Sequence, residues 1–367
     1  MSHDMPEGWA VKALGEVAQL IMGQSPPSSA VSTESGGLPF IQGNAEFGSR
    51  HPTPRLYASS TPKVVRAGDI LLSVRAPVGE VNVAEGPLCI GRGIGGVRAA
   101  NCDPDFLFYA IGGLSSTFAR LSQGSTFDAI NGKELRAIEL TIPPLDEQRR
   151  IAGVLWSISE SVRTTEAAVS AGKAMLTALR ADLTDGPEEA SEAQQVVSLH
   201  DICRPRQHPT ISSKQLTSSG FPAYGANGQI GFYSSYTHES PVVAITCRGA
   251  TCGTINWIPG KSYLTGNAMA LDEVRTDLIN ERFLFHYLSA WGVAKSIAGS
   301  AQPQITRQSL NGIRIVLPEL DEQIAIVALL DSVLAQLEAS FVSLANLIRV
   351  RSEVTSDLLS GRARVPA

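Results

Sequence analysis

Hydrophobic side chains recur at steps of three and four residues along two long stretches of the chain. The first series runs from Ile151 to Leu183, and adding 175 to each position gives a second series from Ile326 to Leu358, with Arg351 as its charged exception. This spacing is typical of an apolar seam on a helix. The sequence therefore predicts two long helices that pack against each other along the seam, at residues 143–186 and 318–361.

Both predicted helices begin with the same short segment, Leu-Asp-Glu-Gln, shortly after a proline. The proline blocks extension towards the N-terminus, and the two carboxylates favour the positive end of the helix dipole. A glycine, Gly186 or Gly361, ends each helix. The repeated segment has a second interpretation as a docking surface for a partner protein, and both interpretations stay open. The candidate partner-binding residues are Leu145, Glu147, Gln148, Leu320, Glu322 and Gln323.

The rest of the chain predicts two mostly β lobes with short helices, an α+β architecture with an internal repeat. Residues 9–143 consist mainly of short strand-like runs bounded by Gly and Pro. Within this region, a helix is predicted from Phe106 to about Leu121. Glycines and core positions recur at offsets of 174 or 175, whereas the loops differ. Such a pair is typical of one scaffold that carries two binding surfaces. The predicted order is first lobe 1–142, first helix 143–186, second lobe 187–317, second helix 318–361 and tail 362–367.

The sequence lacks the patterns that would indicate catalysis. Gly91-Arg-Gly-Ile-Gly-Gly96 matches GxGxxG, but the residues after it cannot form the helix that a dinucleotide or S-adenosylmethionine loop opens into. We interpret it as a glycine-rich turn between strands. No lysine has an acidic residue two positions earlier, as metal-dependent nucleases arrange them, and the six histidines are scattered. We therefore predict a binding protein with no catalytic residue, no metal site and no cofactor of its own.

Composition constrains the environment and the partners. The chain is 43% hydrophobic and 18% charged, as in a folded protein, and its five cysteines form no CxxC pair, so we expect reduced thiols. We find no signal sequence and no apolar run near the roughly 20 residues of a membrane helix, and therefore expect a cytoplasmic protein without membrane contact. The net charge of −5 alone disfavours nucleic acid, but residues 196–318 hold ten Lys and Arg against six Asp and Glu.

Several motifs in order resemble the specificity subunit of Type I restriction-modification systems. They are Pro6-Glu-Gly-Trp9, Gly68-Asp-Ile-Leu-Leu-Ser-Val-Arg-Ala-Pro77 and Gly124-Ser-Thr-Phe127 in the first half, and Tyr224-Gly-Ala-Asn-Gly228 and Asn267-Ala-Met269 in the second. With the repeated Leu-Asp-Glu-Gln segments, the resemblance spans nearly the whole chain. It implies two target recognition domains, each reading half of a bipartite, asymmetric DNA sequence, held apart by two antiparallel helices. It also implies two DNA adenine methyltransferase subunits that bind S-adenosylmethionine, and restriction subunits that use ATP and Mg²⁺ for cleavage.

Polar side chains at the matching positions are the candidates for DNA contact. Arg can bind guanine in two places, Asn and Gln can bind adenine, and Ser, Thr or Lys can hold phosphate. For each of them a role in a turn or a helix cap is the alternative. We single out Arg75 and Arg248, because both follow strands of the same register. The full set is Gln24, Ser25, Gln42, Asn44, Arg75, Arg92, Ser125, Lys133, Arg206, Tyr224, Asn227, Arg248, Gln304, Thr306 and Arg307.

Two other functions are compatible with the sequence. The chain could be the specificity component of another DNA-modification or defence system that uses the same recognition domains. A coiled-coil adaptor that joins two proteins and binds no DNA is a different class, favoured by the acidic balance and disfavoured by the recognition-domain motifs.

Overall fold

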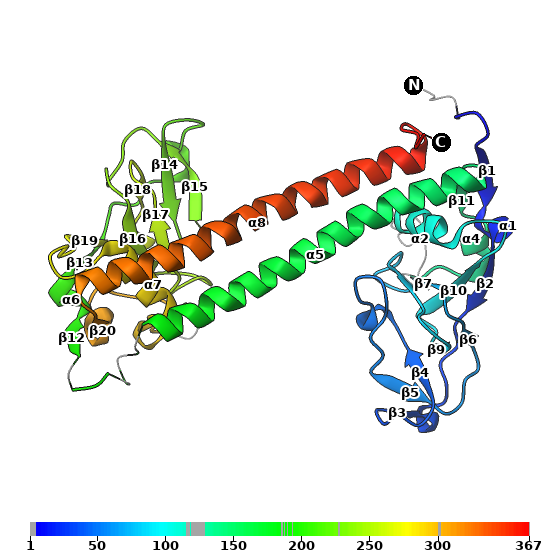
Figure 1. The fold of residues 1–367 in the computed structure, drawn as a ribbon, viewed down its shortest axis with the longest axis horizontal. Coiled ribbons are helices and arrows are strands. Elements are labelled where there is room, and N and C mark those ends of the chain that lie inside the picture. The colour runs from blue at the N-terminus through cyan, green and yellow to red at the C-terminus, as the bar shows by residue number, and fades with distance from the viewer. Residues whose placement is uncertain are drawn as a thin grey trace. The chain divides into compact units, whose positions relative to one another are not determined.

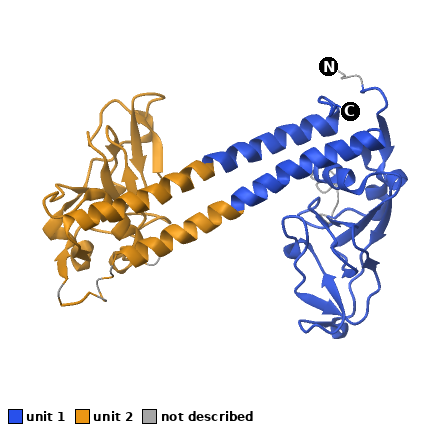
Figure 2. Ribbon diagram, viewed as in Figure 1, with its two compact units in different colours: residues 1–166, 342–367 blue, residues 167–341 orange. Residues whose placement is uncertain are grey.

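The structure is a computed structural model that describes residues 5–114, 118, 129–184, 186, 188, 190–192, 194–226, 228–299 and 302–366. The chain divides into a first unit, residues 1–166 with 342–367, and a second unit, residues 167–341 (Figure 2). Each unit contains one β-rich lobe and a portion of both long helices. The division therefore falls inside the helices and not at their ends, where the sequence suggested domain boundaries.

The two long helices are α5, Leu145–Leu183, and α8, Leu320–Ser360 (Figure 1). Each end lies within three residues of its predicted position. At about 1.5 Å per residue, the 39 residues of α5 extend about 58 Å. The predicted seam is confirmed where it is buried, at Ile151, Leu155 and Val162 in the first unit and at Val169 and Leu176 in the second.

The helices pack against each other in both units. In the first unit, Leu155 of α5 and Leu358 of α8 belong to one buried cluster. In the second, the Lys173 ammonium lies 4.7 Å from the ring centroid of Phe341, and a Cβ on Gly172 would lie 3.2 Å from Cδ1 of Leu337. The beginning of α5 thus meets the end of α8, and the end of α5 meets the beginning of α8. The helices are antiparallel, as the resemblance implied.

Helix α8 corrects one expectation from the sequence. It contains an 18-residue window with a mean hydropathy of 1.7, which is long and apolar enough to cross a membrane by length and composition alone. The expectation that no such stretch exists is therefore wrong. Ile326, Leu330 and Leu337 of α8 are buried, but only 17% of that window is buried within the protein.

The first lobe combines two sheets with short helices. One sheet has the order β2-β10-β7-β8, the other has the order β3-β5-β4-β9-β6, and β1 pairs with β11. The strands are β1 Ala10–Ala13, β2 Ala18–Met22, β3 Val31–Ser32, β4 Leu38–Ile41, β5 Leu56–Ala58, β6 Val64–Val65, β7 Ile70–Ser73, β8 Val81–Val83, β9 Leu88–Ile90, β10 Ile94–Ala99 and β11 Glu139–Ile142. The helices are α1 Leu14–Val17, α2 Pro104–Gly112 and α4 Gly132–Arg136, with short 3-10 turns at Ser28–Ala30 and Asn44–Glu46.

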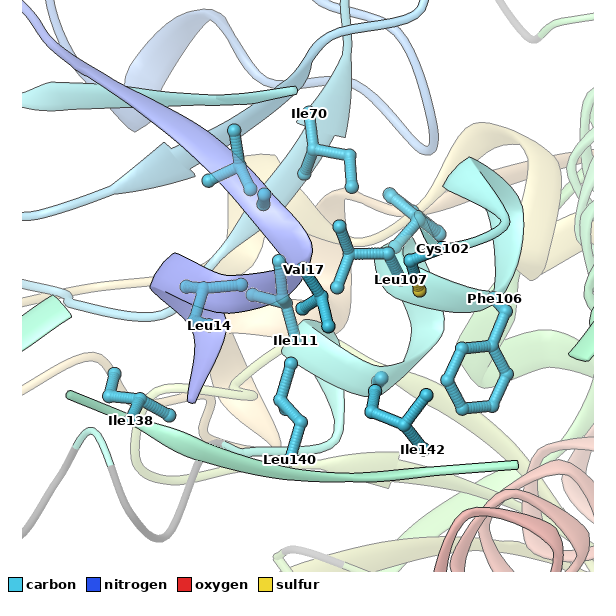
Figure 3. Packing of buried hydrophobic residues seen from close by; sticks show 14 of the residues in the cluster. Leu14, Val17, Ile70, Cys102, Phe106, Leu107, Ile111, Ile138, Leu140 and Ile142 are labelled. Carbon is cyan, nitrogen blue, oxygen red and sulfur yellow. The ribbon is translucent and has the colours of Figure 1, made fainter. Parts of the chain in front are cut away.

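A continuous core joins the first lobe to the long helices. Leu14 and Val17 of α1 pack with Phe106 and Ile111 of α2 and with Leu140 of β11 (Figure 3). The same cluster includes buried residues from the beginning of α5 and the end of α8. Helix α2 begins two residues before the predicted start and ends at Gly112; most of the remaining predicted segment lies outside the described residues.

The second lobe repeats this plan with a smaller second sheet. Its first sheet, β13-β19-β16-β17, matches β2-β10-β7-β8 strand for strand, and β12 pairs with β20 as β1 pairs with β11, but its second sheet, β15-β14-β18, has three strands in place of five. The strands are β12 Gln195–Ser198, β13 Arg204–Gln207, β14 Phe221–Gly225, β15 Gly228–Tyr233, β16 Val242–Thr246, β17 Ile255–Ile258, β18 Tyr263–Leu264, β19 Ala268–Asp272 and β20 Arg314–Leu317. The helices are α6 Leu199–Ile202 and α7 Glu281–Trp291, with 3-10 turns at Ser213–Gln215, Ala294–Ser296 and Gln308–Gly312.

The predicted tail, residues 362–367, is anchored where the structure describes it. Arg364 forms a bidentate ion pair with Glu147 in the first turn of α5. Arg150 donates from Nε to the Val365 carbonyl over 3.3 Å, and the Val365 side chain packs against the core. The segment after α8 is therefore part of the first unit's packing.

Candidate nucleic-acid interface

The sheets of the first lobe bring several strand ends to one edge. Strand β10 runs antiparallel between β2 and β7, with Gly95 opposite Met22 and Ile94 opposite Ser73. The end of β2, the end of β7 and the start of β10 therefore lie together. Strands β4 and β9 are parallel and end side by side at Ile41 and Ile90. We call the loops at these ends the first loop edge: residues 23–25, 42–43, 75 and 91–93.

Five predicted DNA-facing residues gather on the first loop edge: Gln24, Ser25, Gln42, Arg75 and Arg92. The Gln24 amide donates to the Ile90 carbonyl over 2.9 Å, and the Arg92 amide donates to Oγ of Ser25 over 3.3 Å. The side chains of Gln24, Gln42, Arg75 and Arg92 are exposed, and Ser25 is half-buried. The edge thus presents two guanidinium groups and two carboxamides to solvent within one set of hydrogen-bonded loops.

The GxGxxG segment supplies the tight part of this edge. It forms the turn from β9 into β10, so the interpretation as a glycine-rich turn between strands is confirmed. A Cβ on Gly93 would lie 2.6 Å from the Gln42 carbonyl oxygen, and one on Gly23 would lie 2.1 Å from the Gly91 carbonyl oxygen. Glycine is required here because the neighbouring backbones approach too closely for a side chain.

The second lobe builds an equivalent edge from its matching strands. Gln207 at the end of β13 lies opposite Met269, and Thr246 at the end of β16 lies opposite Ala268. We call the corresponding loops the second loop edge: residues 207, 226, 248 and 265–267. The Cys247 amide donates to the Asn267 carbonyl over 3.0 Å, just as the Val74 amide donates to Gly93 over 2.9 Å in the first lobe.

Arg75 and Arg248 occupy equivalent backbone positions, as predicted. Arg75 forms an isolated antiparallel β-bridge with Ala129, and Arg248 forms one with Gln304. Gln304 lies 175 residues after Ala129, the offset of the repeat. The residue before each arginine accepts a hydrogen bond over 3.0 Å, from the amides of Ile130 and Ile305 respectively. Both arginine side chains are exposed. The backbone of each arginine is therefore paired with a neighbouring segment, while its side chain is exposed.

The remaining candidates in this region start short helices beside the edges. Lys133 is exposed in the first turn of α4, where the Asn131 side chain accepts from the amides of residues 133 and 134. In the second lobe, Thr306 plays the same capping role, since its Oγ1 accepts from the Ser309 amide over 3.1 Å, and Arg307 is exposed next to it. Thr306 therefore has a local turn role, and the side chains of Lys133 and Arg307 are exposed.

Three candidates beside the edges make intramolecular contacts. Asn44 donates from Nδ2 to Glu80 over 2.9 Å, which places a carboxylate beside it. The Arg206 guanidinium donates to Glu273 over 3.0 Å. The Tyr224 ring packs on a buried cluster between the sheets. Contact of these three side chains with DNA stays a prediction. Ser125 and Asn227 lie outside the described residues.

One residue of the second loop edge escaped the sequence-based prediction. Gln207 donates from Nε2 to the Gly266 carbonyl over 2.7 Å and contacts Sγ of Cys247 over 3.1 Å, so it connects the loops on either side. Burial is the main cause that raises the pKa of Cys247, which keeps this thiol neutral. The sequence does contain a pattern that could have placed Gln207. Leu14-Gly-Glu-Val17 and Leu199-His-Asp-Ile202 are 185 residues apart, and this offset aligns Gln207 with Met22 at the end of β2.

The repeated Leu-Asp-Glu-Gln segments have an internal role. Gln148 accepts at Oε1 from the Asp103 amide and donates from Nε2 to the Pro143 carbonyl, each over 2.8 Å. Gln323 does the same with the Asn280 amide and the Pro318 carbonyl, also over 2.8 Å each. Both glutamines are buried, so their side chains fix each long helix to the N-cap of α2 or α7 and are not available for docking.

The other predicted docking residues differ between the two segments. Glu147 is buried and accepts hydrogen bonds from the Trp9 indole, over 3.1 Å, and from Arg364. The hydrogen bonds from Arg364 lower the pKa of Glu147. Its counterpart Glu322 is exposed, as is Leu145, whereas Leu320 is half-buried. The two surfaces are therefore unequal, as the sequence indicated from their different charges.

Each unit also has a groove beside the long helices. In the second unit a cavity of about 600 Å³ lies between the sheets, α7 and α8, and in the first unit one of about 990 Å³ lies beside α2, α5 and α8. Long-helix residues at matching offsets of 175 line both: Asp331, Leu334 and Glu338 in the second, and Trp156, Ser159 and Arg163 in the first. The two grooves are thus equivalent positions of the repeat with different side chains.

Comparison with known proteins gives the same picture for sequence and structure. A family model described as Type I restriction modification DNA specificity domain matches residues 6–169 and 191–340. The putative type I restriction enzyme MjaX specificity subunit of Methanocaldococcus jannaschii is 45% identical over 163 residues, 43% of this chain and 38% of that protein. The MjaVIII specificity subunit of the same organism is 22% identical over 403 residues, 98% of this chain and 94% of that protein. The alignment with MjaX thus spans less than two fifths of that relative's length.

Solved structures share the fold at low sequence identity. The Type-I restriction-modification system S subunit from M. genitalium has a TM-score of 0.74 at 16% identity and covers 98% of this chain and 97% of its own. A chain from a structure of the type I R-M system, titled for complex assembly and conformational transition, has a TM-score of 0.57 at 20% identity, with 98% and 100% coverage. At these identities the likeness concerns the fold alone.

Proposed function

Because the chain belongs to the Type I restriction modification DNA specificity domain family, we propose that it is the DNA-recognition subunit of a type I restriction-modification complex. Each lobe reads one half of a bipartite, asymmetric target. The observation that carries this proposal is the pair of equivalent loop edges, on which Arg75 and Arg248 project from matching backbone bridges. The loops around them differ in sequence, as two readers of different half-sites require.

The chemistry of the two edges suits base recognition in the major groove. A guanidinium group can donate two parallel hydrogen bonds to O6 and N7 of guanine, and a carboxamide can pair with adenine in the same way. The first loop edge offers Arg75, Arg92, Gln24 and Gln42 for these contacts, and Lys133 beside it suits a phosphate. In the second lobe, Arg248 and Gln304 bridge each other's backbones and Arg307 lies at the next turn. The net charge of −5 does not oppose this arrangement, since Arg75, Arg92 and Arg248 are exposed at the edges.

The long helices serve two purposes in this proposal. They set the gap between the two half-sites, and they hold the partner subunits. Exposed apolar side chains on both helices offer contacts for the second purpose: Trp156 and Met175 on α5, and Ile324, Leu329, Phe341, Val342, Ile348 and Val350 on α8. The two equivalent grooves beside the helices support two partner subunits in related positions.

The partners supply the reaction. We propose two DNA adenine methyltransferase subunits that bind S-adenosylmethionine, with restriction subunits that use ATP and Mg²⁺ where the complex cleaves DNA. The chain itself is non-catalytic and cytoplasmic in this proposal. Because Gln148 and Gln323 are buried, we propose that the partners dock on the outward faces of the long helices and not on these two glutamines.

Substitution of Arg248 tests the proposal in the assembled complex. Arg248→Ala should weaken binding to the cognate duplex about 5- to 150-fold, the equivalent of about 1–3 kcal/mol for one bidentate base contact. Arg275→Ala is the matched control, because Arg275 is equally exposed but forms an ion pair with Asp277 beyond the opposite end of β19. Fluorescence anisotropy with labelled duplex measures both. Equal affinities for the parent and Arg248→Ala would remove Arg248 from the interface.

A second pair of measurements separates DNA recognition from a protein adaptor. In the complex, Arg75→Ala should change sensitivity to base substitutions in one half-site only, and Arg248→Ala in the other half-site only. An adaptor would assemble with its partners and show no sequence-dependent binding in any variant. The modified-adenine motif in host DNA, compared with and without this gene, distinguishes a methylating complex from another defence system.

A further inference from the structure

Three residues far apart in the sequence meet at one corner of the second lobe. His208 follows β13, His238 precedes β16, and Asp272 ends β19. Nε2 of His208 lies 3.2 Å from one Asp272 oxygen, and Nε2 of His238 lies 2.9 Å from the other. The potential ligand atoms lie within 4.8 Å of one another. The scattered spacing of the histidines, which predicted no metal site, concealed this cluster.

We propose that His208, His238 and Asp272 form a binding site for a divalent transition metal of the Zn²⁺ class. Two imidazoles and one carboxylate are a donor set that suits Zn²⁺, whereas Mg²⁺ and Ca²⁺ prefer oxygen alone. Tetrahedral bonds of about 2.0–2.1 Å place ligand atoms about 3.3 Å apart, so small side-chain movements bring these three into range. The side chains are 16%, 12% and 11% exposed, so solvent reaches the cluster and a water molecule would be the fourth ligand.

The surroundings of His238 favour a metal-binding tautomer. Nδ1 of His238 lies 2.8 Å from Oγ1 of Thr237, and this oxygen also accepts from the Leu264 amide over 3.0 Å. When the hydroxyl donates to the Ser262 carbonyl 3.3 Å away, its remaining lone pair accepts the Nδ1–H of His238. The Nε2 lone pair then points towards Asp272. A cation between these two atoms removes the repulsion, and the contact to Thr237 orients the ring, as outer partners of metal ligands commonly do.

The nearby charges allow a divalent ion. The Arg206 guanidinium approaches Asp272 to 3.7 Å, but it donates to Glu273 over 3.0 Å, and Arg204 also pairs with Glu273 over 3.1 Å. The carboxylate of Glu273 therefore offsets the charge of these two guanidinium groups, although Arg206 stays within ion-pair range of Asp272. In the alternative tautomers, in which Nε2–H of an imidazole donates to Asp272, metal binding needs that proton to leave or move to Nδ1.

The first lobe indicates what this site would do. Asp272 lies opposite Arg204, and the equivalent register position in the first lobe is Arg98, opposite Gln19. Arg98 forms a bidentate ion pair with Asp69 over 2.8 and 2.6 Å. Both lobes thus place a charged cross-link at this corner. In the second lobe, the backbone of His238 forms an antiparallel β-bridge with Ser262, next to β18. A metal at this corner would therefore join the first sheet to the smaller second sheet and stabilise the loops of both sheets.

Metal titration of the full chain tests the site. After dialysis against a chelator, the parent chain should bind one Zn²⁺ per chain by calorimetry, and Co²⁺ should give the visible ligand-field absorption of a four-coordinate site. At a hundredfold excess over the dissociation constant, Zn²⁺ should raise the melting temperature of the second unit by about 5–10 °C. Mg²⁺ should do neither. Less than one tenth of a Zn²⁺ per chain, or a six-coordinate Co²⁺ spectrum, would overturn the proposal.

Variants assign the ligands. His238→Gln and Asp272→Asn should each abolish the Co²⁺ absorption, whereas His51→Gln should leave it unchanged, because His51 lies in the first lobe and contacts the Val83 carbonyl. Unchanged Zn²⁺ binding by the folded His238→Gln chain would refute the site. A thiolate-to-cobalt charge-transfer band would assign the metal to one of the five cysteines and overturn the proposal equally. If a ligand variant fails to fold, the Co²⁺ spectrum of the parent chain still decides.

Discussion

Replacing Gln323 by methionine tests whether the repeated Leu-Asp-Glu-Gln segment fixes the long helix to its lobe. The Gln323 side chain is fully buried and makes three hydrogen bonds to backbone: Oε1 accepts from the Asn280 amide over 2.8 Å, and Nε2 donates to the carbonyls of Pro318 and Leu278 over 2.8 and 3.0 Å. Methionine has a similar length and flexibility, so Gln323→Met removes the hydrogen bonds and leaves little cavity.

The expected loss follows from the backbone groups left without a partner. Each net hydrogen bond contributes about 0.5–1.5 kcal/mol, and each buried polar group left unpaired costs about 1–3 kcal/mol. For three bonds, with partial relaxation, we expect the free energy of unfolding of the second unit to fall by about 3–5 kcal/mol. In a unit of this size the melting temperature should fall by about 6–20 °C.

Calorimetry of the full chain provides the assay, and hydrogen exchange provides the local readout. The transition of the second unit should move to lower temperature, and the Asn280 amide should exchange faster because it loses its acceptor. Glu322→Met is the matched control, since Glu322 is the exposed neighbour in the same helical turn. If Gln323→Met melts at the same temperature as Glu322→Met, the hydrogen bonds of Gln323 do not hold the helix start, and the reasoning fails.

Two further predictions concern the first loop edge and a buried histidine. Gly93→Ala should weaken DNA binding at least about fivefold, because its Cβ would lie 2.6 Å from the Gln42 carbonyl oxygen and displace that loop. Gly43→Ala, with open space around the Cβ, should bind like the parent chain in the same anisotropy assay. A displaced loop with unchanged affinity would show that this edge does not contact DNA. Burial lowers the pKa of His286 from about 6.5 to about 4. As the pH falls, His286 is therefore protonated at a higher pH in the unfolded chain than in the folded chain. The second unit should lose about 3 kcal/mol of stability between pH 6.5 and pH 4. Urea unfolding at several pH values measures this, and His286→Gln should flatten the profile; a parent profile as flat as that of the variant would contradict the shift.

The sequence determined the features of this protein that arise from local periodicity and repetition. The heptad spacing around Leu155 and Val162 identified the two long helices, because a helix converts steps of three and four residues directly into a buried face. The 175-residue offset identified the duplication. Arg75 and Arg248 were paired correctly for the same reason, since each follows a strand at a fixed place in the repeat.

Only the tertiary structure decided which side chains meet across the chain. Gln148 and Gln323 resembled a docking motif, but burial turned them into internal hydrogen-bonding groups, and nothing local to the sequence distinguishes the two roles. Asn44 and Arg206 have chemistry that suits DNA, and the fold also gives each of them an acidic partner. Hydrogen bonds and ion pairs between distant segments depend on how the strands are ordered in the sheets.

The corner formed by His208, His238 and Asp272 shows the same division most clearly. The sequence separates these residues by 30 and 34 positions, which matches no metal-binding spacing, so local reasoning predicted no site. Three separate chain segments bring their polar atoms within 4.8 Å, because β13 pairs with β19 and the segment before β16 folds over their edge. Periodicity is a property of neighbouring residues and can be derived from the sequence, whereas proximity between these side chains exists only after the sheets have paired.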